Sequence, residues 1–241
     1  MISTLKNYFL FVDTETSGLP KRWDQPYSLK GNWPFSIQIA WIIFDKNGVE
    51  IKRENYYINE KDFSIDPSAL KVHGITHQFL EQNGQRRKKV MNKLAYDIKK
   101  YDPILVGHFI ELDFHMLSAD FYRSGIYCPL DGYPLFCTML ASKQYVENPR
   151  AKFLRLSELY TYLFDQSVSN IHNAIVDVEI TAASFFELVR RGDINDQIID
   201  AHQSYFAPQK PTRRTENRWG MLILFLLILL LIVFTCYERQ D

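Results

Sequence analysis

Two carboxylates that stand two residues apart give the first indication of chemistry in this sequence. Asp13 and Glu15 follow a short apolar run that begins at Tyr8. Alternate residues of a strand point to the same side, so both carboxylates face one way. Carboxylates that converge repel one another unless a cation lies between them, and they are hard oxygen ligands for Mg²⁺ or Mn²⁺. Taken alone, the pair is equally well explained as a solvated strand end before a turn.

Two later stretches add further candidates of the same kind. Asp113 stands where a helix begins after a short apolar strand, and an acid there also suits the helix dipole. His172 precedes Asp177 by five residues, at the start of another helix. Asp177 lies next to the apolar positions Ile175 and Val178, so it points toward the protein body. Each stretch by itself is weak evidence for a site.

The elements that must position these residues are indicated by hydrophobic periodicity. A three-strand antiparallel meander is followed by alternating strands and helices, which predicts an α/β fold with a mixed five-stranded sheet flanked by helices. Strands are expected at Tyr8–Val12, Ser36–Asp45, Val49–Ile58, Ile104–Val106 and Leu135–Phe136. Helices are expected near Val90–Tyr101, Phe114–Tyr122, Met139–Tyr145, Leu156–Leu163 and Ile175–Arg191.

Two other stretches lie outside these elements or at their ends. Lys21–Pro34 is an irregular insertion between the first two strands, because Pro26, Gly31 and Pro34 interrupt regular structure. It stands beside the first acidic pair, so we expect it to line the entrance to a site. The cluster Arg86-Arg87-Lys88-Lys89 opens a helix, and we interpret it as a solvated helix face rather than a phosphate contact.

The order of the motifs resembles a known family, the DEDDh 3′→5′ exonucleases. That group includes the proofreading epsilon subunit of bacterial DNA polymerase III and ribonuclease T. The similar stretches are FVDTETSGLP, LVGHFIELDFHML and HNAIVDVEIT, together with Val72–Thr76 and the helix Leu154–Leu163. The resemblance covers residues 7–190. Two positions depart from the family pattern: Phe109 stands where Asn is usual, and Cys137 where Asp is common.

The resemblance implies a ribonuclease H-like fold and a metal-dependent exonuclease that releases nucleoside 5′-monophosphates from DNA. Two divalent cations, Mg²⁺ or Mn²⁺, would be held by Asp13, Glu15, Asp113 and Asp177, with Asp13 as the bridging ligand. His172 would act as the general base toward the attacking water. Contacts with the terminal nucleotide are expected at Thr14, Thr16, His73, Ile75 and Leu112.

Other functions stay open at this point. An exoribonuclease that trims RNA 3′ ends is not distinguished from a DNA enzyme, because recognition of the sugar depends largely on backbone and shape. An inactive, membrane-anchored nucleic-acid-binding protein of the same fold is a third possibility. The presence of all four carboxylates and His172 disfavours it. A generic mixed-sheet domain with coincidental motifs is disfavoured by five matches in order.

Composition narrows the class of protein. Of 241 residues, 28 are Lys or Arg and 28 are Asp or Glu, so the formal net charge is zero. This balance excludes a strongly basic coat-type nucleic-acid binder, but an enzyme depends only on local charge. The three cysteines, Cys128, Cys137 and Cys236, form no Cys-x-x-Cys pair. A zinc ribbon or thioredoxin motif is therefore excluded, and a reducing compartment is indicated.

The C-terminal run Trp219–Tyr237 contains no charged residue. As a helix it would extend roughly 28 Å, which is close to the hydrocarbon thickness of a bilayer. Three arginines precede the run and one follows it, which predicts a single-pass anchor with the catalytic part on the cytoplasmic side. The expected organisation is an exonuclease domain (1–205), a basic linker (206–218), a transmembrane helix (219–237) and a short tail (238–241).

Overall fold

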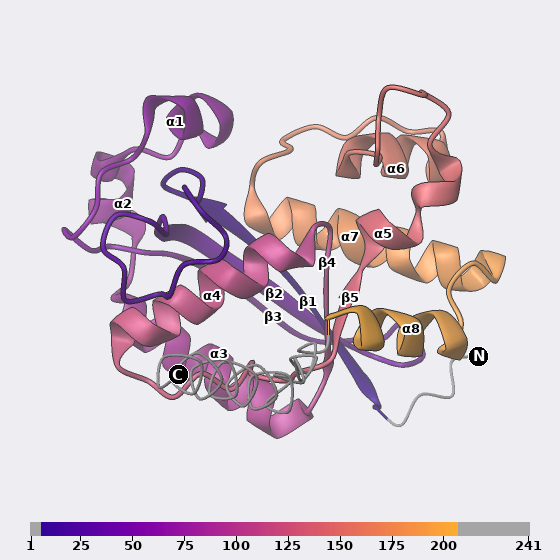
Figure 1. Ribbon diagram of the computed structural model, residues 1–241, viewed down its shortest axis with the longest axis horizontal. Coiled ribbons are helices and arrows are strands. Elements are labelled where there is room, and N and C mark those ends of the chain that lie inside the picture. Colours follow the sequence, from indigo (N-terminus) through magenta and orange to yellow (C-terminus); the bar gives the residue numbers. More distant parts are fainter. Residues whose placement is uncertain (1–5, 207–241) are drawn as a thin grey trace, which may run out of the picture. The chain divides into compact units, whose positions relative to one another are not determined.

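A computed structural model describes residues 6–206, which form a five-stranded mixed sheet with helices on both faces (Figure 1). The strand order is β3-β2-β1-β4-β5. β1, β2 and β3 pair antiparallel, and β4 and β5 run parallel to β1. The strands are β1 (Tyr8–Thr16), β2 (Ser36–Asp45), β3 (Glu50–Tyr57), β4 (Ile104–Gly107) and β5 (Leu135–Cys137). The predicted mixed sheet is confirmed.

The first strand is longer than predicted. It was expected to end at Val12, but pairing with β2 continues to Thr16, which lies opposite Ser36. Asp13 and Glu15 therefore lie within the strand rather than beyond it. The register shifts between Glu15 and Thr16, and such irregularities end strand pairing and redirect side chains.

The helices include several that hydrophobic periodicity did not indicate. These are α1 (Pro67–His73), α2 (His77–Asn83) and α8 (Asp196–Phe206). The signals for α1 were present in the sequence: Asp66 accepts from the Ser68 N–H as N-cap, and Gly74 ends the helix in the left-handed region. The others are α3 (Arg87–Tyr101), α4 (Ile110–Ser124), α5 (Thr138–Ala141), a 3₁₀ turn η1 (Lys143–Tyr145), α6 (Leu156–Phe164) and α7 (Ala174–Arg191).

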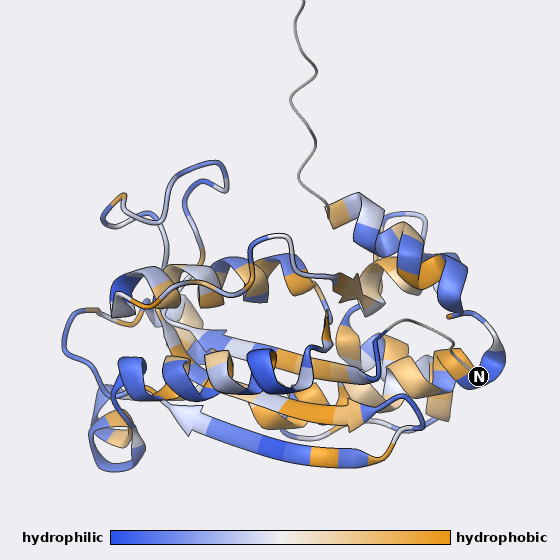
Figure 2. Ribbon diagram, turned by 90° about the horizontal axis from the view of Figure 1, so that it is seen from below, coloured by the Kyte–Doolittle hydropathy of each residue, from blue (hydrophilic) through white to orange (hydrophobic). Residues whose placement is uncertain are grey.

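The sheet separates two apolar cores, because alternate residues of β1 point to opposite faces. Phe9 and Phe11 pack against α7, where Phe185 lies within 5.4 Å of both ring centroids. Leu10 and Val12 pack on the other face, against α3 and α4. Figure 2 shows apolar residues concentrated on the inner strands of the sheet, whereas the strand at its edge is mostly hydrophilic. The ends of β1 and of these helices are thus fixed relative to one another.

The basic cluster at the start of α3 corrects one expectation. Arg87 is not solvated: it is 5% exposed, its two terminal nitrogens donate to Asp62, and its Nε lies 3.4 Å from Asp120. Asp120 is fully buried and also accepts from Arg123 at 2.8 Å. Burying a carboxylate requires such partners, which explains why one arginine of the four turns inward. The other three cations are exposed, as predicted.

Within residues 6–206, no helix is both long and apolar enough to cross a membrane. The predicted transmembrane helix (219–237), the short tail (238–241) and all but the first residue of the predicted linker lie outside the described residues.

Candidate active site

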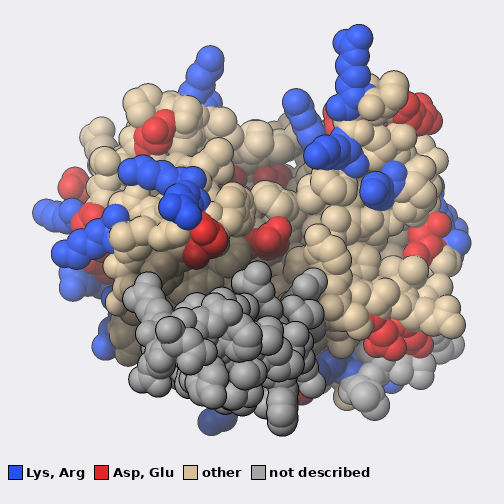
Figure 3. Space-filling model, viewed as in Figure 1, with Lys and Arg blue, Asp and Glu red and all other residues tan. Residues whose placement is uncertain are grey.

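The four predicted carboxylates converge near the point where β1 leaves the sheet. Asp13 and Glu15 come from β1, Asp113 from the first turn of α4, and Asp177 from the first turn of α7. Asp13 is within electrostatic reach of the other three, whose charges all act on it. On the face seen in Figure 3, acidic side chains lie in a hollow whose rims carry Lys and Arg. The structure thus assembles the acids that the sequence had placed far apart.

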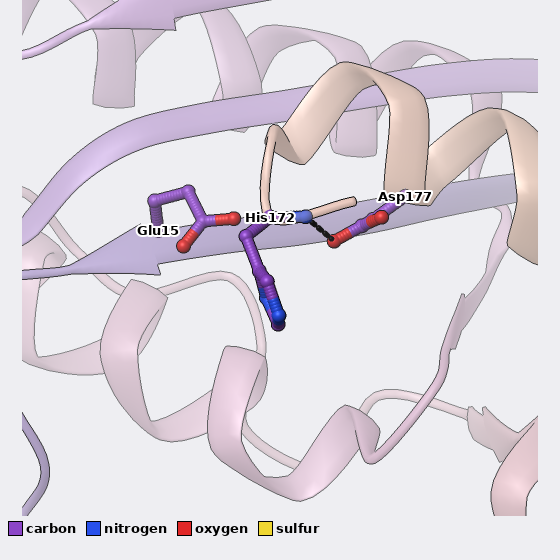
Figure 4. A group of neighbouring side chains, drawn as sticks. All are labelled: Glu15, His172 and Asp177. Atoms are coloured by element: carbon purple, nitrogen blue, oxygen red, sulfur yellow. Dashed lines mark hydrogen bonds between the residues drawn. The ribbon is translucent and has the colours of Figure 1, made fainter. Parts of the chain in front are cut away.

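One part of this cluster has the geometry of a metal site. Glu15, His172 and Asp177 each offer a ligand atom, and these atoms lie within 4.8 Å of one another (Figure 4). Oδ2 of Asp177 accepts from the backbone N–H of His172 at 3.1 Å. Oδ1 of Asp177 is buried, yet no described residue donates a hydrogen bond to it. An orphaned carboxylate oxygen beside a second acid fits a hard cation.

The raised pKa values of the carboxylates in this cluster also indicate a cation-binding site. Burial, followed by the charge of Asp177, raises the pKa of Glu15 to about 7. Burial raises the pKa of Asp177 to about 6 and that of Asp113 to about 8, against the lowering effect of local hydrogen bonds. Burial and the charges of its three neighbours hold the pKa of Asp13 well above its usual range. Such an unbalanced group of acids is suited to binding divalent cations.

Asp113 is positioned by a sharp turn and by one hydrogen bond. The turn from β4 into α4 is tight: a Cβ at Gly107 would lie 2.8 Å from Ile110 Cδ1 and 3.3 Å from Ile110 Cα, so any larger residue would require Ile110 to shift. Phe109 then adopts a left-handed conformation with φ 72°. Oγ1 of Thr14 donates to Oδ1 of Asp113 at 2.8 Å across the buried interior. Thr14 therefore connects β1 directly to a predicted metal ligand.

His172 and Asp177 are positioned by a buried amide that our sequence analysis missed. Gln38 lies opposite Glu15 in the β1–β2 register and is fully buried. Its Nε2 donates to Oδ1 of Asn173 at 2.9 Å, and its Oε1 accepts from the Ala174 N–H at 3.2 Å. The available signal was a glutamine inside the apolar strand SIQIAWII, where an amide needs partners.

The predicted substrate-contact residues on β1 and α4 lie beside the acids. The side chain of Thr14 is occupied by Asp113, and Oγ1 of Thr16 donates to the Gly18 carbonyl at 2.6 Å. Leu112 is half-buried and adjacent to Asp113 in the chain. Their roles toward a nucleotide remain predictions.

The two substrate-contact residues predicted within Val72–Thr76, His73 and Ile75, lie in different surroundings. Ile75 is only 8% exposed and packs with Ile37 and Leu80, so most of its surface is already used inside the protein. His73 is half-buried, and its Nδ1 accepts from the Ile75 N–H at 2.9 Å. Burial lowers the pKa of His73; the Thr16 backbone opposes this shift, and the charge of His172 adds to it. His73 thus borders the site, and Ile75 supports it from within.

The two departures from the family pattern are packing residues. Phe109 lies against Trp23 of the insertion, with ring centroids 5.8 Å apart. Cys137 is 1% exposed and packs in the core on the α3 and α4 face. Neither side chain takes a ligand position in the acidic cluster, so both leave it complete.

Comparison with known proteins identifies the family of this chain and a similar fold. The RNase T family, described as exonuclease, matches residues 10–185. A structure of exonuclease I superposes with a TM-score of 0.65 at 21% identity, over 81% of this chain and 43% of that one. E. coli exonuclease I in complex with a dA16 oligonucleotide gives 0.66 at 20% identity, over the same shares. The chain thus spans less than half of exonuclease I, and the likeness concerns the fold. No curated protein matches the chain.

Proposed function

This chain belongs to the RNase T family of exonucleases, and we propose that it hydrolyses DNA from the 3′ end in a metal-dependent reaction. The observation that carries this proposal is the convergence of Asp13, Glu15, Asp113 and Asp177, with His172 beside them. Five groups from β1, α4, α7 and the loop before α7 come together without a balancing cation among residues 6–206. A merely structural cluster would be expected to include a cationic partner, as Asp120 has in Arg87 and Arg123.

The cations that fit this site would be held by the four carboxylates, with Asp13 central because all three neighbours act on it. When bound, a pair of Mg²⁺ or Mn²⁺ ions supplies an activated water and stabilises the attacking and leaving oxygens. The buried, unpartnered Oδ1 of Asp177 is the most direct support for this carboxylate as a cation ligand. The hydrogen bond from Thr14 orients the carboxylate of Asp113, another of the four proposed ligands.

His172 is suited to take the proton of the attacking water. It is exposed, so its imidazole is available to solvent and substrate. Its backbone is fixed by the hydrogen bond to Asp177, and it adopts φ 70°, which turns the chain sharply just before α7. A general base must be held within hydrogen-bond reach of the proton it removes, and this arrangement supplies such a fixed base at the edge of the acidic cluster.

DNA is proposed over RNA as substrate because the solved structures of exonuclease I include complexes with DNA oligonucleotides. The sequence carries no net charge, so binding would rest on contacts near the site rather than on a general basic surface. RNA of the same sequence is therefore the necessary comparison in any assay.

The test uses the full chain, purified without metal and mixed with 5′-labelled DNA or RNA of one sequence. A ladder shortening from the 3′ end is expected only after Mg²⁺ or Mn²⁺ is added. Asp13→Asn should abolish the ladder, whereas Asp200→Asn, on the exposed side of α8, should leave it intact. No shortening by the folded wild-type protein with either nucleic acid would contradict the proposal, and faster shortening of RNA would reassign the substrate.

We also propose that the uncharged run Trp219–Tyr237 anchors this exonuclease to a membrane with residues 1–218 on the cytoplasmic side. The support is its length, its lack of charge and the arginines that precede it. Two arginines in the middle of the run, Leu227→Arg with Leu230→Arg, should release the full chain from alkaline-washed membranes. Retention of that variant, or a wild-type chain that is recovered without membranes, would contradict the anchor.

A further inference from the structure

One side of α3 is cationic along the length of the helix. The apolar residues of α3 pack into the protein. Its one acid, Asp97, is fully buried and accepts hydrogen bonds from Lys52 and Trp41. At 3.6 residues per turn, the five lysines that are not buried fall within about 140° of the helix circumference. We call this side the α3 lysine face. It consists of Lys88, Lys89, Lys93, Lys99 and Lys100.

The charge of the α3 lysine face is not neutralised from within the protein. Among residues 6–206, no carboxylate forms an ion pair with any of the five lysines. Lys93 lies over the ring of Tyr56, 5.4 Å from its centroid, and Lys100 lies over the ring of Tyr101 at 4.7 Å. These ring contacts hold the side chains without cancelling their charge. The face therefore presents positive charge to an anionic partner.

A hollow beside the face is lined by cations as well. It has a volume of about 800 Å³ and is bounded by α3 and by Lys52 of β3. Arg86 and three of the five lysines contribute to its lining, and no acid does. Asn92 and Tyr96 complete it, and Tyr96 leaves 62% of its surface exposed. Lysines grouped in this way suit a phosphate or a carboxylate as a point charge.

A partner bound to this face would leave the acidic cluster open. The end of β1 is tied to the segment before α1, because the Asp66 N–H donates to the Ser17 carbonyl at 2.8 Å. In Figure 1, α1 lies at the upper edge of the molecule and α3 at the lower edge. The α3 lysine face is thus separate from the end of β1 that carries Asp13 and Glu15.

The last described residue lies on the side of the sheet that α3 covers. Phe206 packs against the apolar core that α3 and α4 share. Residues 207–218 separate it from the uncharged run that we propose as a membrane anchor. A chain of that length spans at most about 45 Å when fully extended. Such an anchor would therefore keep a bilayer surface within about 45 Å of Phe206.

We propose that the α3 lysine face binds the anionic lipid headgroups of the membrane that holds the anchor. The cytoplasmic leaflet carries a negative surface potential, which attracts lysines that lie within a Debye length of it. Tyr96 stands among the lysines, and tyrosine is enriched at membrane interfaces. The acidic cluster would then stay accessible from the cytoplasm. This inference rests on the proposed anchor, which brings the face within reach of a bilayer, and does not depend on the nuclease reaction.

Lysine acetylation tests the contact on the full chain. The protein is reconstituted into nanodiscs of phosphatidylcholine, either alone or with about 30% phosphatidylserine as the anionic lipid. Mass spectrometry after brief acetylation gives the rate at each lysine. With phosphatidylserine, the rates on the α3 lysine face should fall about 5-fold or more, and about 0.5 M salt should restore them. Lys30, Lys71 and Lys152 are exposed elsewhere and should react equally in both discs.

A second measurement removes the contribution of the anchor. The full chain carrying Leu227→Arg with Leu230→Arg is floated with vesicles of the same two compositions, and it should bind only those with phosphatidylserine. Adding Lys88→Glu, Lys89→Glu and Lys99→Glu should weaken that binding by about 10-fold or more, because each reversal turns attraction to the headgroups into repulsion. No binding before the lysines are exchanged would contradict the inference.

The matched control is Lys30→Glu with Lys71→Glu and Lys152→Glu, which makes the same change in net charge away from α3. It should weaken vesicle binding by less than about 3-fold, since distant charges are screened. If the wild type is anchored but its α3 lysines react equally in both discs, the α3 inference is wrong and the anchor stands. If the wild type is recovered without membranes yet binds phosphatidylserine vesicles through α3, the anchor is wrong and the α3 lysine face stands. Loss of DNA binding in place of vesicle binding would also overturn the inference.

Discussion

The side chain of Gln38 donates to Oδ1 of Asn173 at 2.9 Å, which joins two residues separated by 135 positions in the chain. Gln38 lies opposite Glu15 on the neighbouring strand, and Asn173 is the N-cap of the helix that carries Asp177. The spacing between Glu15 and Asp177 is therefore set by Gln38. This residue is uncharged and, in our proposal, contacts neither the attacking water nor the substrate.

Replacing Gln38 by Leu should reduce both stability and turnover. It leaves the half-buried Asn173 side chain and the buried Ala174 N–H without partners, and a buried orphan such as the Ala174 N–H costs about 1–3 kcal/mol. Because the loop of His172 would loosen, kcat should fall about 10- to 100-fold while KM changes little. Thermal melting and steady-state kinetics measure both. Asn55→Ala removes the outward partner of Gln38 and should have a much smaller effect on kcat; equal effects would refute a positioning role.

The metal-free protein should lose stability as the pH rises. The pKa values of Glu15, Asp113 and Asp177 are raised on folding to between about 6 and 8, so the folded state binds more protons than the unfolded chain. This contribution is complete below the unfolded pKa values near about 4 and is lost as pH climbs through the folded ones. Melting temperatures recorded with EDTA should fall by several degrees between about pH 5 and pH 9. A flat profile, or a steeper one in Glu15→Gln, would contradict this assignment.

Metal binding should show the opposite dependence on pH. Cations bind the deprotonated carboxylates, so protons compete with them wherever these pKa values are raised. The Mg²⁺ concentration for half-maximal activity should therefore fall about 10-fold or more between pH 6 and pH 8. Titration calorimetry should record proton release on binding at about pH 7. Glu15→Gln removes one of the competing groups and should flatten the trend; an unchanged trend would place the competition elsewhere.

His172 should be needed for turnover but not for metal binding. His172→Asn is the appropriate variant, because asparagine tolerates the left-handed backbone that this residue adopts. We expect kcat to fall about 10²- to 10⁴-fold, the usual range for loss of a general base. The affinity for Mg²⁺, measured by calorimetry, should change by less than about 3-fold. His77→Asn, on an exposed histidine of α2, serves as the control. Loss of metal affinity would make His172 a ligand instead.

The insertion should loosen when one of its aromatic contacts, that between Trp23 and Phe109 just before α4, is removed. Phe109→Asn introduces the residue usual in the family and tolerates the same backbone, but it loses the ring that packs against Trp23. Trypsin should then cut at Lys21, Arg22 or Lys30 about 10-fold faster, because cleavage follows local opening. Mass spectrometry identifies the sites. Trp23→Phe keeps an aromatic contact and should stay protected; equal cleavage of the two variants would show that Trp23 and Phe109 do not hold the loop.

Much of the fold and the set of acids follow from local signals. Four of the five strands, β1, β2, β4 and β5, are short and largely apolar runs. Asp13, Glu15, Asp113, His172 and Asp177 occur in stretches whose order is specific. What sequence reasoning missed depends on partners far away in the chain. The end of β1 depends on β2, because Thr16 stays in the strand only through Ser36.

Arg87 shows the same limit on a single side chain. Three neighbouring cations remain in solvent, while Arg87 turns inward because Asp62 and Asp120 are there to receive it. Nothing within the basic cluster distinguishes it from the others. Phe109 is a related case. In the sequence, its departure from the family pattern and the insertion Lys21–Pro34 are separate observations. In the structure they are connected, because Phe109 contacts Trp23 of the insertion.

The helices that carry Asp113 and Asp177 are each entered through a left-handed residue that is not glycine, Phe109 at φ 72° and His172 at φ 70°. Such a backbone costs a side-chain-bearing residue of the order of 1 kcal/mol. A library selected only for heat resistance should therefore gather glycine or asparagine at residue 172, where the side chain is exposed, whereas the contact with Trp23 favours phenylalanine at residue 109. Selection for catalysis should restore the imidazole at residue 172, whatever the thermal penalty. Thermal stability and turnover thus favour different residues at position 172.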